Sequence, residues 1–351
     1  MTLTASNTII LSVNTNISRP QKYYIRILSL GIGILVVLLG IFASISYGAA
    51  DIPIAKILTA FTNYDDSTEH IIIRPMRLPR TLIASMVGAS LAVAGALMQG
   101  LTQNPLASPG ILGINAGAAL AVVVMVFGFS TSTPALITLV AFLGALIAAL
   151  AVYSLGSLGQ GGATPLNLTV AGAALTALLS SITTGVLVLS ERTLEEVRFW
   201  LAGSIAGRDF NLFLTVLPWM IVGLLTAFAL SRQINVLSLG ESIATGLGQQ
   251  TGWIKLATAS SVVILAGSAV ALAGPIGFVG LVVPHLARGV MGVDYRWVLP
   301  CAAVFGADLL IWADLAARWL IRPQELPVGV MTALLGAQFL LYLVRWRVKR
   351  G

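Results

Sequence analysis

The sequence predicts an all-α polytopic membrane protein with about ten transmembrane helices in a compact bundle. Of its 351 residues, 57% are hydrophobic and only 9% are charged, whereas a soluble domain carries about 25% charged residues. No Asp, Glu, Lys, Arg or His occurs anywhere from Thr81 to Ser190. Because one spanning helix needs about 20 apolar residues, this stretch alone holds four spans.

Breaks in the apolar pattern divide the chain into individual spans. Clusters rich in Gly, Pro, Ser, Thr and Asn at 102–110, 128–134 and 156–167 separate the four spans of the uncharged stretch. The segment 256–293 is too long for one helix, and Gly-Pro-Ile-Gly at 274–277 splits it into two spans of about 18 residues each. The remaining spans are expected at 27–50, 211–231, 297–317 and 326–344.

The residue inventory argues against several classes of protein. One cysteine and two histidines exclude a disulfide scaffold and a Cys-rich metal cluster. The basic residues stand singly among apolar runs, so a bilayer and not a nucleic acid is the expected partner. An intramembrane enzyme is one class to consider. His70, His285 and Cys301 are isolated in the sequence, and neither the H-E-x-x-H nor the G-x-S-x-G motif occurs, which argues against an enzyme of this class. We therefore expect no catalytic residue, no metal site and no cofactor.

Positive charge at both ends predicts the topology. Residues 1–26 form a polar segment with three basic residues, and the apolar run that follows is longer than a signal peptide's core of about 7–15 residues, so we expect an uncleaved first span. The chain also ends in a basic tail. The positive-inside rule then places both termini of the 27–347 membrane domain, and its loop at 235–252, in the cytoplasm. An unusual set of arginines remains outside: Arg74, Arg77, Arg80, Arg192, Arg198, Arg208, Arg318 and Arg322.

The outer arginines include a compact pair. Arg77 and Arg80 lie three residues apart around Pro79, which we expect to form a rigid turn that presents both guanidinium groups together. Arginine offers a planar fork that binds carboxylates through two hydrogen bonds, so one hypothesis is a carboxylate receptor. The alternative is an anchor whose long side chains reach the lipid headgroups.

The loop at 235–252 is unusually apolar for a connector. It predicts one or two short helices interrupted by glycine, with a single acidic residue, Glu241. Such a surface suits docking into a groove of a soluble partner. The alternative is a helix that lies in the membrane interface.

Five segments in order resemble the FecCD-type permeases, the membrane subunits of binding-protein-dependent ABC importers for iron-siderophores, haem and cobalamin. The resemblance covers nearly all of the chain after about residue 27. The segments are 77–118, which begins RLPRTLIASMVGAS, LSLGESIATGLG at 237–248, GPIGFVGLVVPHLAR at 274–288, ADLAAR at 313–318, and ELPVGVMTALLGAQFLLYLVR at 325–345.

The resemblance implies a multi-pass subunit of the bacterial cytoplasmic (inner) membrane that pairs with itself or with a paralogous permease around a central path. It implies a periplasmic or lipid-anchored substrate-binding protein outside and two ATP-binding cassette subunits inside. Binding-protein docking carries over onto Arg77, Arg80 and Arg318. ATPase coupling carries over onto Leu239, Gly240, Glu241, Ala244, Leu247 and Gly248. A cytoplasmic gate would fall at Thr164, Pro165, Leu166 and Asn167.

The source of energy separates this function from its main rival. The chain lacks the Walker A pattern G-x-x-x-x-G-K-[ST], so we expect ATP hydrolysis in a separate subunit. The rival is a proton-coupled secondary transporter, suggested by Asp308 within the ninth span, where an acid costs about 2.5–3.5 kcal/mol. We expect Asp308 to be hydrogen-bonded by Ser, Thr or a backbone amide, and Asp314 to pair with Arg318 four residues on.

Iron-siderophore is the predicted cargo, with haem and cobalamin as alternatives.

Overall fold

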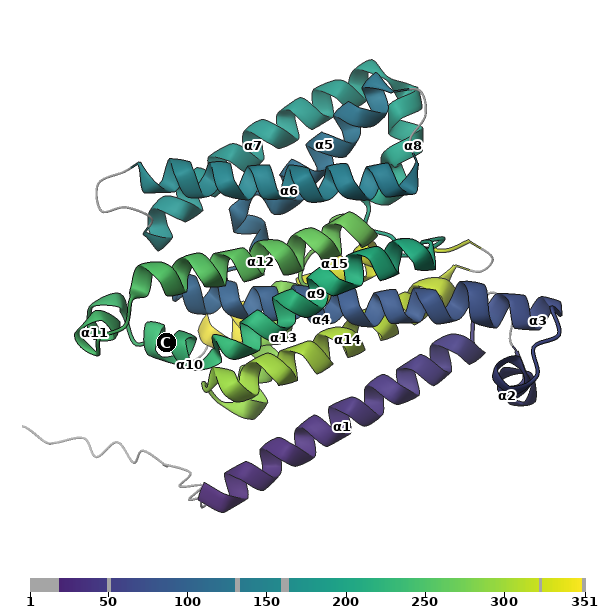
Figure 1. Ribbon diagram of the computed structural model, residues 1–351, viewed down its shortest axis with the longest axis horizontal. Helices are drawn as coiled ribbons and strands as arrows, with labels where there is room; N and C mark the ends of the chain where they lie inside the picture. Colours follow the sequence, from purple (N-terminus) through teal and green to yellow (C-terminus); the bar gives the residue numbers. More distant parts are fainter. Residues whose placement is uncertain (1–18, 49–51, 130–132, 159–163, 322–323, 349–351) are drawn as a thin grey trace, which may run out of the picture.

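The computed structural model describes residues 19–48, 52–129, 133–158, 164–321 and 324–348. These residues are mostly helical and contain no strand (Figure 1). The prediction of an all-α membrane protein is therefore confirmed. The N-terminal segment predicted at 1–26 lies largely outside the described residues, and its last part already belongs to the first helix.

Ten apolar helices follow the order of the ten predicted spans. Seven are long enough to cross a membrane, and three shorter apolar helices complete the set. They are α1 (Arg19–Ser46), α4 (Leu78–Thr102), α5 (Ile114–Gly128), α6 (Pro134–Ser157), α7 (Pro165–Leu189), α9 (Phe210–Ala229), α12 (Thr251–Ala273), α13 (Val279–Met291), α14 (Tyr295–Leu320) and α15 (Val328–Val348).

Short helices that the apolar pattern does not reveal connect the spans. They are α2 (Ile54–Thr62), α3 (Thr68–Ile71), the π-helix η1 (Ile72–Arg77), the 3₁₀ turn η2 (Pro109–Leu112), α8 (Glu191–Leu201), α10 (Ser231–Leu237) and α11 (Glu241–Gly246). α8 is charged on one face and buries Val197 and Trp200 on the other. Helices of this kind lack the long apolar run that identifies a span, so their positions depend on packing.

The bundle has two ends. α4 and α14 run antiparallel, and we call the end where α4 begins and α14 finishes the arginine end. The opposite end, which carries α10 and α11, is the loop end (Figure 1). α1 begins and α15 finishes at the loop end.

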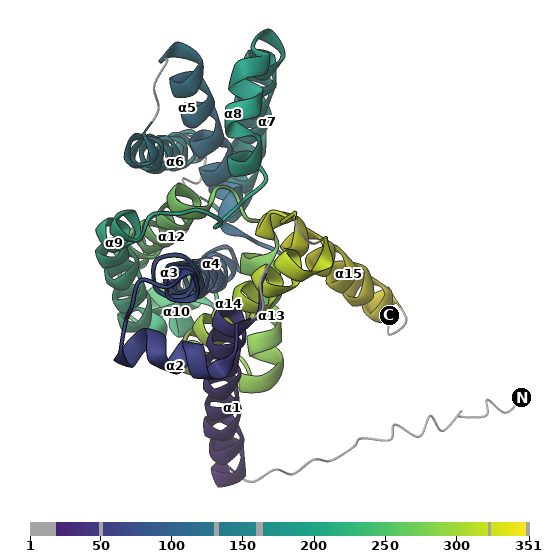
Figure 2. The same ribbon diagram turned by 90° about the vertical axis from the view of Figure 1, so that its right-hand side faces the viewer.

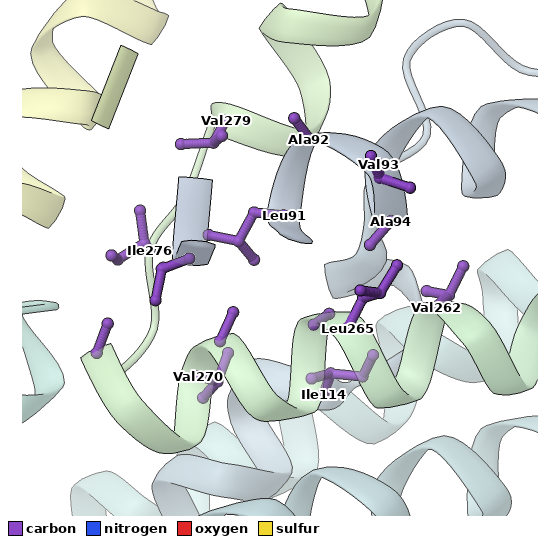
Figure 3. Close-up of a cluster of buried hydrophobic side chains, with 14 of the residues drawn as sticks. Leu91, Ala92, Val93, Ala94, Ile114, Val262, Leu265, Val270, Ile276 and Val279 are labelled. Carbon is purple, nitrogen blue, oxygen red and sulfur yellow. The ribbon is translucent and has the colours of Figure 1, made fainter. Parts of the chain in front are cut away.

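α4 is the central helix. Nearly every residue from Thr81 to Thr102 is buried, and α4 packs against α14, α12, α13 and α9. Figure 3 shows part of this core, in which Leu91 and Val93 of α4 lie in the same cluster as Leu265 and Val270 of α12.

Glycines bring the neighbours of α4 into backbone contact. A Cβ atom on Gly88 would lie 2.1 Å from the carbonyl oxygen of Gly306 on α14, and one on Gly95 would lie 1.9 Å from that of Gly280 on α13. Close approach of this kind replaces the hydrophobic driving force that helices lack inside a bilayer.

A second layer covers one side of this core. α5, α6, α7 and α8 pack on one another, and α6 and α5 contact α12 (Figures 1 and 2). On the opposite side of α4, α1 packs along α14 (Figure 2). α7 is the least buried of the seven long spans found among the described residues, so those residues leave one apolar face of this layer uncovered.

Candidate functional site

A pocket of about 360 Å³ opens at the arginine end. Four arginines and one glutamate contribute to its wall, which gives it a surplus of positive charge. We call it the arginine pocket, and it is lined by Gly48, Ile72, Pro75, Met76, Arg77, Arg80, Gly207, Arg208, Arg318 and Glu325. The structure thus brings together the three arginines predicted for docking.

One buried carboxylate holds two of these arginines. The Asp314 side chain is 2% exposed and accepts hydrogen bonds from Arg80 Nε at 3.1 Å and Nη2 at 2.8 Å. Its other oxygen lies 2.9 Å from Arg318 Nη2, so the predicted Asp314–Arg318 pair is confirmed. Arg80 also donates from Nη1 to Glu325 at 2.7 Å. Asp314 therefore joins the arginine ends of α4 and α14.

Arg77 and Arg318 bind the last turn of α1. Arg77 Nη1 donates to the carbonyl oxygens of Ile45 at 2.7 Å and Ser46 at 3.0 Å, and Arg318 Nη1 donates to that of Ser44 at 3.2 Å. The last carbonyl groups of a helix lack intrahelical donors and carry partial negative charge. With 6% and 3% of their surfaces exposed, these two arginines are bound to protein and do not reach toward lipid headgroups.

The expected proline turn is wrong. Pro79 is the second residue of α4, and Pro75 lies inside the π-helix before it. Proline is tolerated in the first turn of a helix because the backbone N–H there has no intrahelical acceptor. The helix therefore continues through Pro79, and Arg77 and Arg80 reach different partners instead of presenting one fork.

Arg208 is a member of the pocket that the sequence did not single out. It lies in the loop before α9, and its Nε donates to the carbonyl oxygen of Ser204 at 3.2 Å. Burial lowers the pKa of its guanidinium, and among the described residues no acidic side chain pairs with it. Its place among the outer arginines was the only signal in the sequence, because the pocket forms from segments distant in the chain.

The loop end carries the two short helices expected in the 235–252 loop. Gly240 separates α10 from α11 with a φ of +115°, which favours glycine. Leu239, Ile243 and Leu247 are 60%, 51% and 67% exposed, whereas Ala244 is buried against the bundle. Glu241 pairs with Lys255 of α12 at 2.5 Å. Gly248 has a φ of +80°, so glycines bound α11 on both sides.

The residues predicted for the gate lie at the loop end, where α7 begins. Thr164 caps the helix, and its Oγ1 accepts from the backbone N–H of Asn167 at 3.2 Å. Pro165 is the first helical residue, and Leu166 is 71% exposed. The segment is a rigid helix start, and its role as a gate stays a prediction.

Asp308 differs from its expectation. Its Oδ1 is buried and has no hydrogen-bond partner among the described residues, so the expected hydrogen bond from Ser, Thr or a backbone amide is wrong at this atom. Asp308 lies four residues before Trp312, which contacts Gly40 of α1. The ring of His285 packs edge-on against the ring of Phe339 on α15.

Comparison with known proteins decides the family. The model of the FecCD transport family matches residues 35–346. The chain belongs to the FecCD transport family. Two relatives in Bacillus subtilis are the siderophore transport system permease YfiZ, 51% identical over 89% of this chain and 94% of that protein, and the iron(3+)-hydroxamate import permease FhuB, 43% identical over 97% and 89%.

A solved structure agrees with the FecCD assignment. An ABC transporter described as metal-chelate type, in an inward-facing conformation, superposes with a TM-score of 0.80 at 29% identity, covering 90% of this chain and 98% of that one. The predicted family and the all-α membrane fold of this FecCD chain are both confirmed.

The buried Asp314 generates a stability prediction. Asp314→Asn leaves Arg80 and Arg318 without their shared charge, and breaking a buried pair costs about 3–5 kcal/mol. We expect a clear fall in the melting temperature of the detergent-solubilised chain. Glu325→Gln is the matched control, because Glu325 is 33% exposed and its loss costs about 1 kcal/mol or less. Equal melting temperatures for the two variants would contradict the central role of Asp314.

Proposed function

We propose that this chain is the membrane permease subunit of an ATP-driven importer that moves a ferric siderophore into a bacterial cell. The match to the FecCD family over residues 35–346 carries the proposal. The names of its relatives YfiZ and FhuB, a siderophore permease and an iron-hydroxamate permease, support a ferric siderophore as the cargo.

The arrangement of charge supports the orientation. α1 begins and α15 ends at the loop end, and the basic residues near both termini support a cytoplasmic position for that end by the positive-inside rule. The arginine pocket then faces outward. The arginines of the pocket donate hydrogen bonds into the protein, to Asp314, Ser44 and Ile45. These buried contacts explain why the arginines can lie on the outer side although the positive-inside rule favours basic residues in cytoplasmic loops.

The surfaces at the two ends of the bundle support a different partner at each end. The exposed side chains of Leu239, Ile243 and Leu247 form an apolar surface for a groove of the ATPase subunit. The arginine pocket suits carboxylates of a substrate-binding protein, with Arg208 and Arg80 as its most available donors. The uncovered apolar face of α7, near the predicted gate, suits a second permease subunit across the transport path.

A second function, proton-coupled transport, has less support. It would rest on Asp308, whose buried Oδ1 lacks a partner. A relay needs a succession of titratable groups. Family membership favours the ABC importer.

Uptake of radioactive iron tests the cargo. Cells that lack this gene should lose uptake of ⁵⁵Fe supplied as a ferric hydroxamate or a ferric catecholate, and a plasmid copy should restore it. Hemin and cobalamin uptake, measured in the same cells, should not change. Retained ferric siderophore uptake together with lost hemin or cobalamin uptake would reassign the cargo.

Gly240→Arg tests the coupling surface. The change places a long charged side chain beside Leu239, so we expect the permease to insert normally but to lose co-purification with its ATPase subunits. Gly240→Ala is the matched control, since it strains the same positive φ without adding bulk or charge, and should retain the complex. A normal yield of complex from Gly240→Arg would make the loop a passive connector.

Arg208→Glu tests the outer site while sparing the Asp314 pairs. We expect the affinity for the binding protein to fall about tenfold, since reversing one partly desolvated charge pair costs more than about 1.4 kcal/mol. Arg192→Glu makes the same charge change on α8, outside the pocket, and should have little effect. Titration of the binding protein against the permease complex gives both affinities, and equal losses in the two variants would indicate a general field effect.

A further inference from the structure

A single side chain joins the α10 helix to the start of α14. Asn235 Nδ2 donates to Asp294 Oδ1 at 2.7 Å, and Asn235 Oδ1 accepts from the backbone N–H of Tyr295 at 2.8 Å. Asp294 also caps α14 by accepting from the backbone N–H of Arg296 at 3.0 Å. Asn235 therefore binds the N-terminus of α14 through both of its polar atoms.

Other contacts make α10 rigid with the bundle. Gln103, just after α4, donates to the carbonyl oxygen of Leu237 at 3.1 Å. Ile234 and Leu237 are fully buried. A Cβ atom on Gly100 of α4 would lie 2.7 Å from Ile234 Cγ2 and 2.8 Å from Tyr295 Oη. α10, α4 and α14 thus meet without intervening space.

The neighbouring α11 has the opposite character. Its apolar side chains are exposed, and Ala244 is its only buried residue. α11 is joined to α10 across Gly240 and to α12 through the Glu241–Lys255 ion pair, so a force applied to α11 reaches both of these helices. Asn235 is the polar contact between α10 and α14.

α14 and α4 extend this connection across the bundle. α14 has 26 residues, which is about 39 Å of helix. It touches α4 along its length at Gly88 and Gly306 and is tied to Arg80 through Asp314 at the far end. A displacement of Asp294 therefore moves a rigid helix pair that ends at the arginine pocket.

We propose that Asn235 and Asp294 form the joint that transmits movement of the ATPase-bound loop to α14, and that Asn235 is a positioning residue for coupled transport. This inference rests on the proposed docking of the ATPase at the loop. Hydrogen bonding by Arg296 lowers the pKa of Asp294 to about 2. Because a carboxylate with the ordinary Asp pKa of about 3.9 is also ionised in the neutral range, Asp294 accepts from Asn235 with or without the Arg296 side chain.

Asn235→Ala removes the joint and leaves α11 unchanged. The variant is reconstituted with the ATPase subunits and the binding protein in proteoliposomes, and ⁵⁵Fe is supplied as the ferric hydroxamate or catecholate that the unchanged complex takes up. We expect normal assembly and continued ATP hydrolysis, with the ATP consumed per iron transported raised roughly three- to tenfold, as expected for losing one or two hydrogen bonds from the coupled state.

Arg296→Ala is the matched control. Arg296 is the other partner of Asp294, through a 2.8 Å ion pair at the surface, and its removal leaves both Asn235 bonds in place. We expect the ATP consumed per iron to stay at the unchanged value. A similar rise in both variants would assign the effect to the loss of any side-chain partner of Asp294 and overturn the joint.

An exchanged pair tests the joint by rescue. In Asn235→Asp alone two carboxylates face each other, so coupling should be lost. Adding Asp294→Asn restores complementarity, because the new carboxylate accepts from both the new amide and the Tyr295 N–H. If the double variant recovers the normal ATP-to-iron ratio, the result supports the joint. This holds even if the Asn235→Ala variant fails to assemble. An exchanged pair that assembles but stays uncoupled, or fails to assemble, overturns it.

Two further outcomes separate this inference from the function on which it rests. An Asn235→Ala complex with an unchanged ATP-to-iron ratio overturns the joint but leaves ATPase docking intact. Normal co-purification of the Gly240→Arg variant with the ATPase would instead overturn docking at the loop, whatever the result at Asn235.

Discussion

The buried carboxylate of Asp314 makes the interactions on which the arginine end of the molecule depends. It pairs with both Arg80 of α4 and Arg318 of α14, and Arg318 in turn binds the last turn of α1. A charge buried without a counter-ion would cost several kcal/mol, so each member requires the others. Three spans are therefore fixed to one another where the pocket opens, and the pocket keeps its shape without a partner.

The glycine contacts continue this constraint through the membrane. Gly88 and Gly306 bring α4 and α14 to backbone contact, and Gly100 receives Ile234 and Tyr295 at the loop end. Small residues and interhelical hydrogen bonds stabilise helix pairs in lipid, where apolar side chains gain little by leaving the bilayer. The two ends of the protein are consequently connected by a closely packed pair of helices, while most of α11 and one face of α7 remain exposed.

The same packing gives the arginines of the pocket different roles. Arg77 and Arg318 satisfy carbonyl groups of α1 and act as structural support for the pocket wall. Arg80 is shared between Asp314 and the half-exposed Glu325, and a carboxylate arriving from outside would compete with Glu325. Arg208 has no acidic partner among the described residues, and its Nε donates only to the carbonyl oxygen of Ser204 in the hydrogen bonds that the structure shows.

The sequence by itself determined the ten apolar helices, the family and the Asp314–Arg318 pair. All three can be read from residues that lie near one another in the sequence. A bilayer demands a continuous apolar run, and a helix places residues four apart side by side. Only the tertiary structure decided that Arg80, 234 positions from Asp314, shares its carboxylate, that Arg208 joins the pocket, and that Asn235 binds Asp294. These contacts join segments far apart in the chain, and helix packing alone selects which of many polar side chains meet.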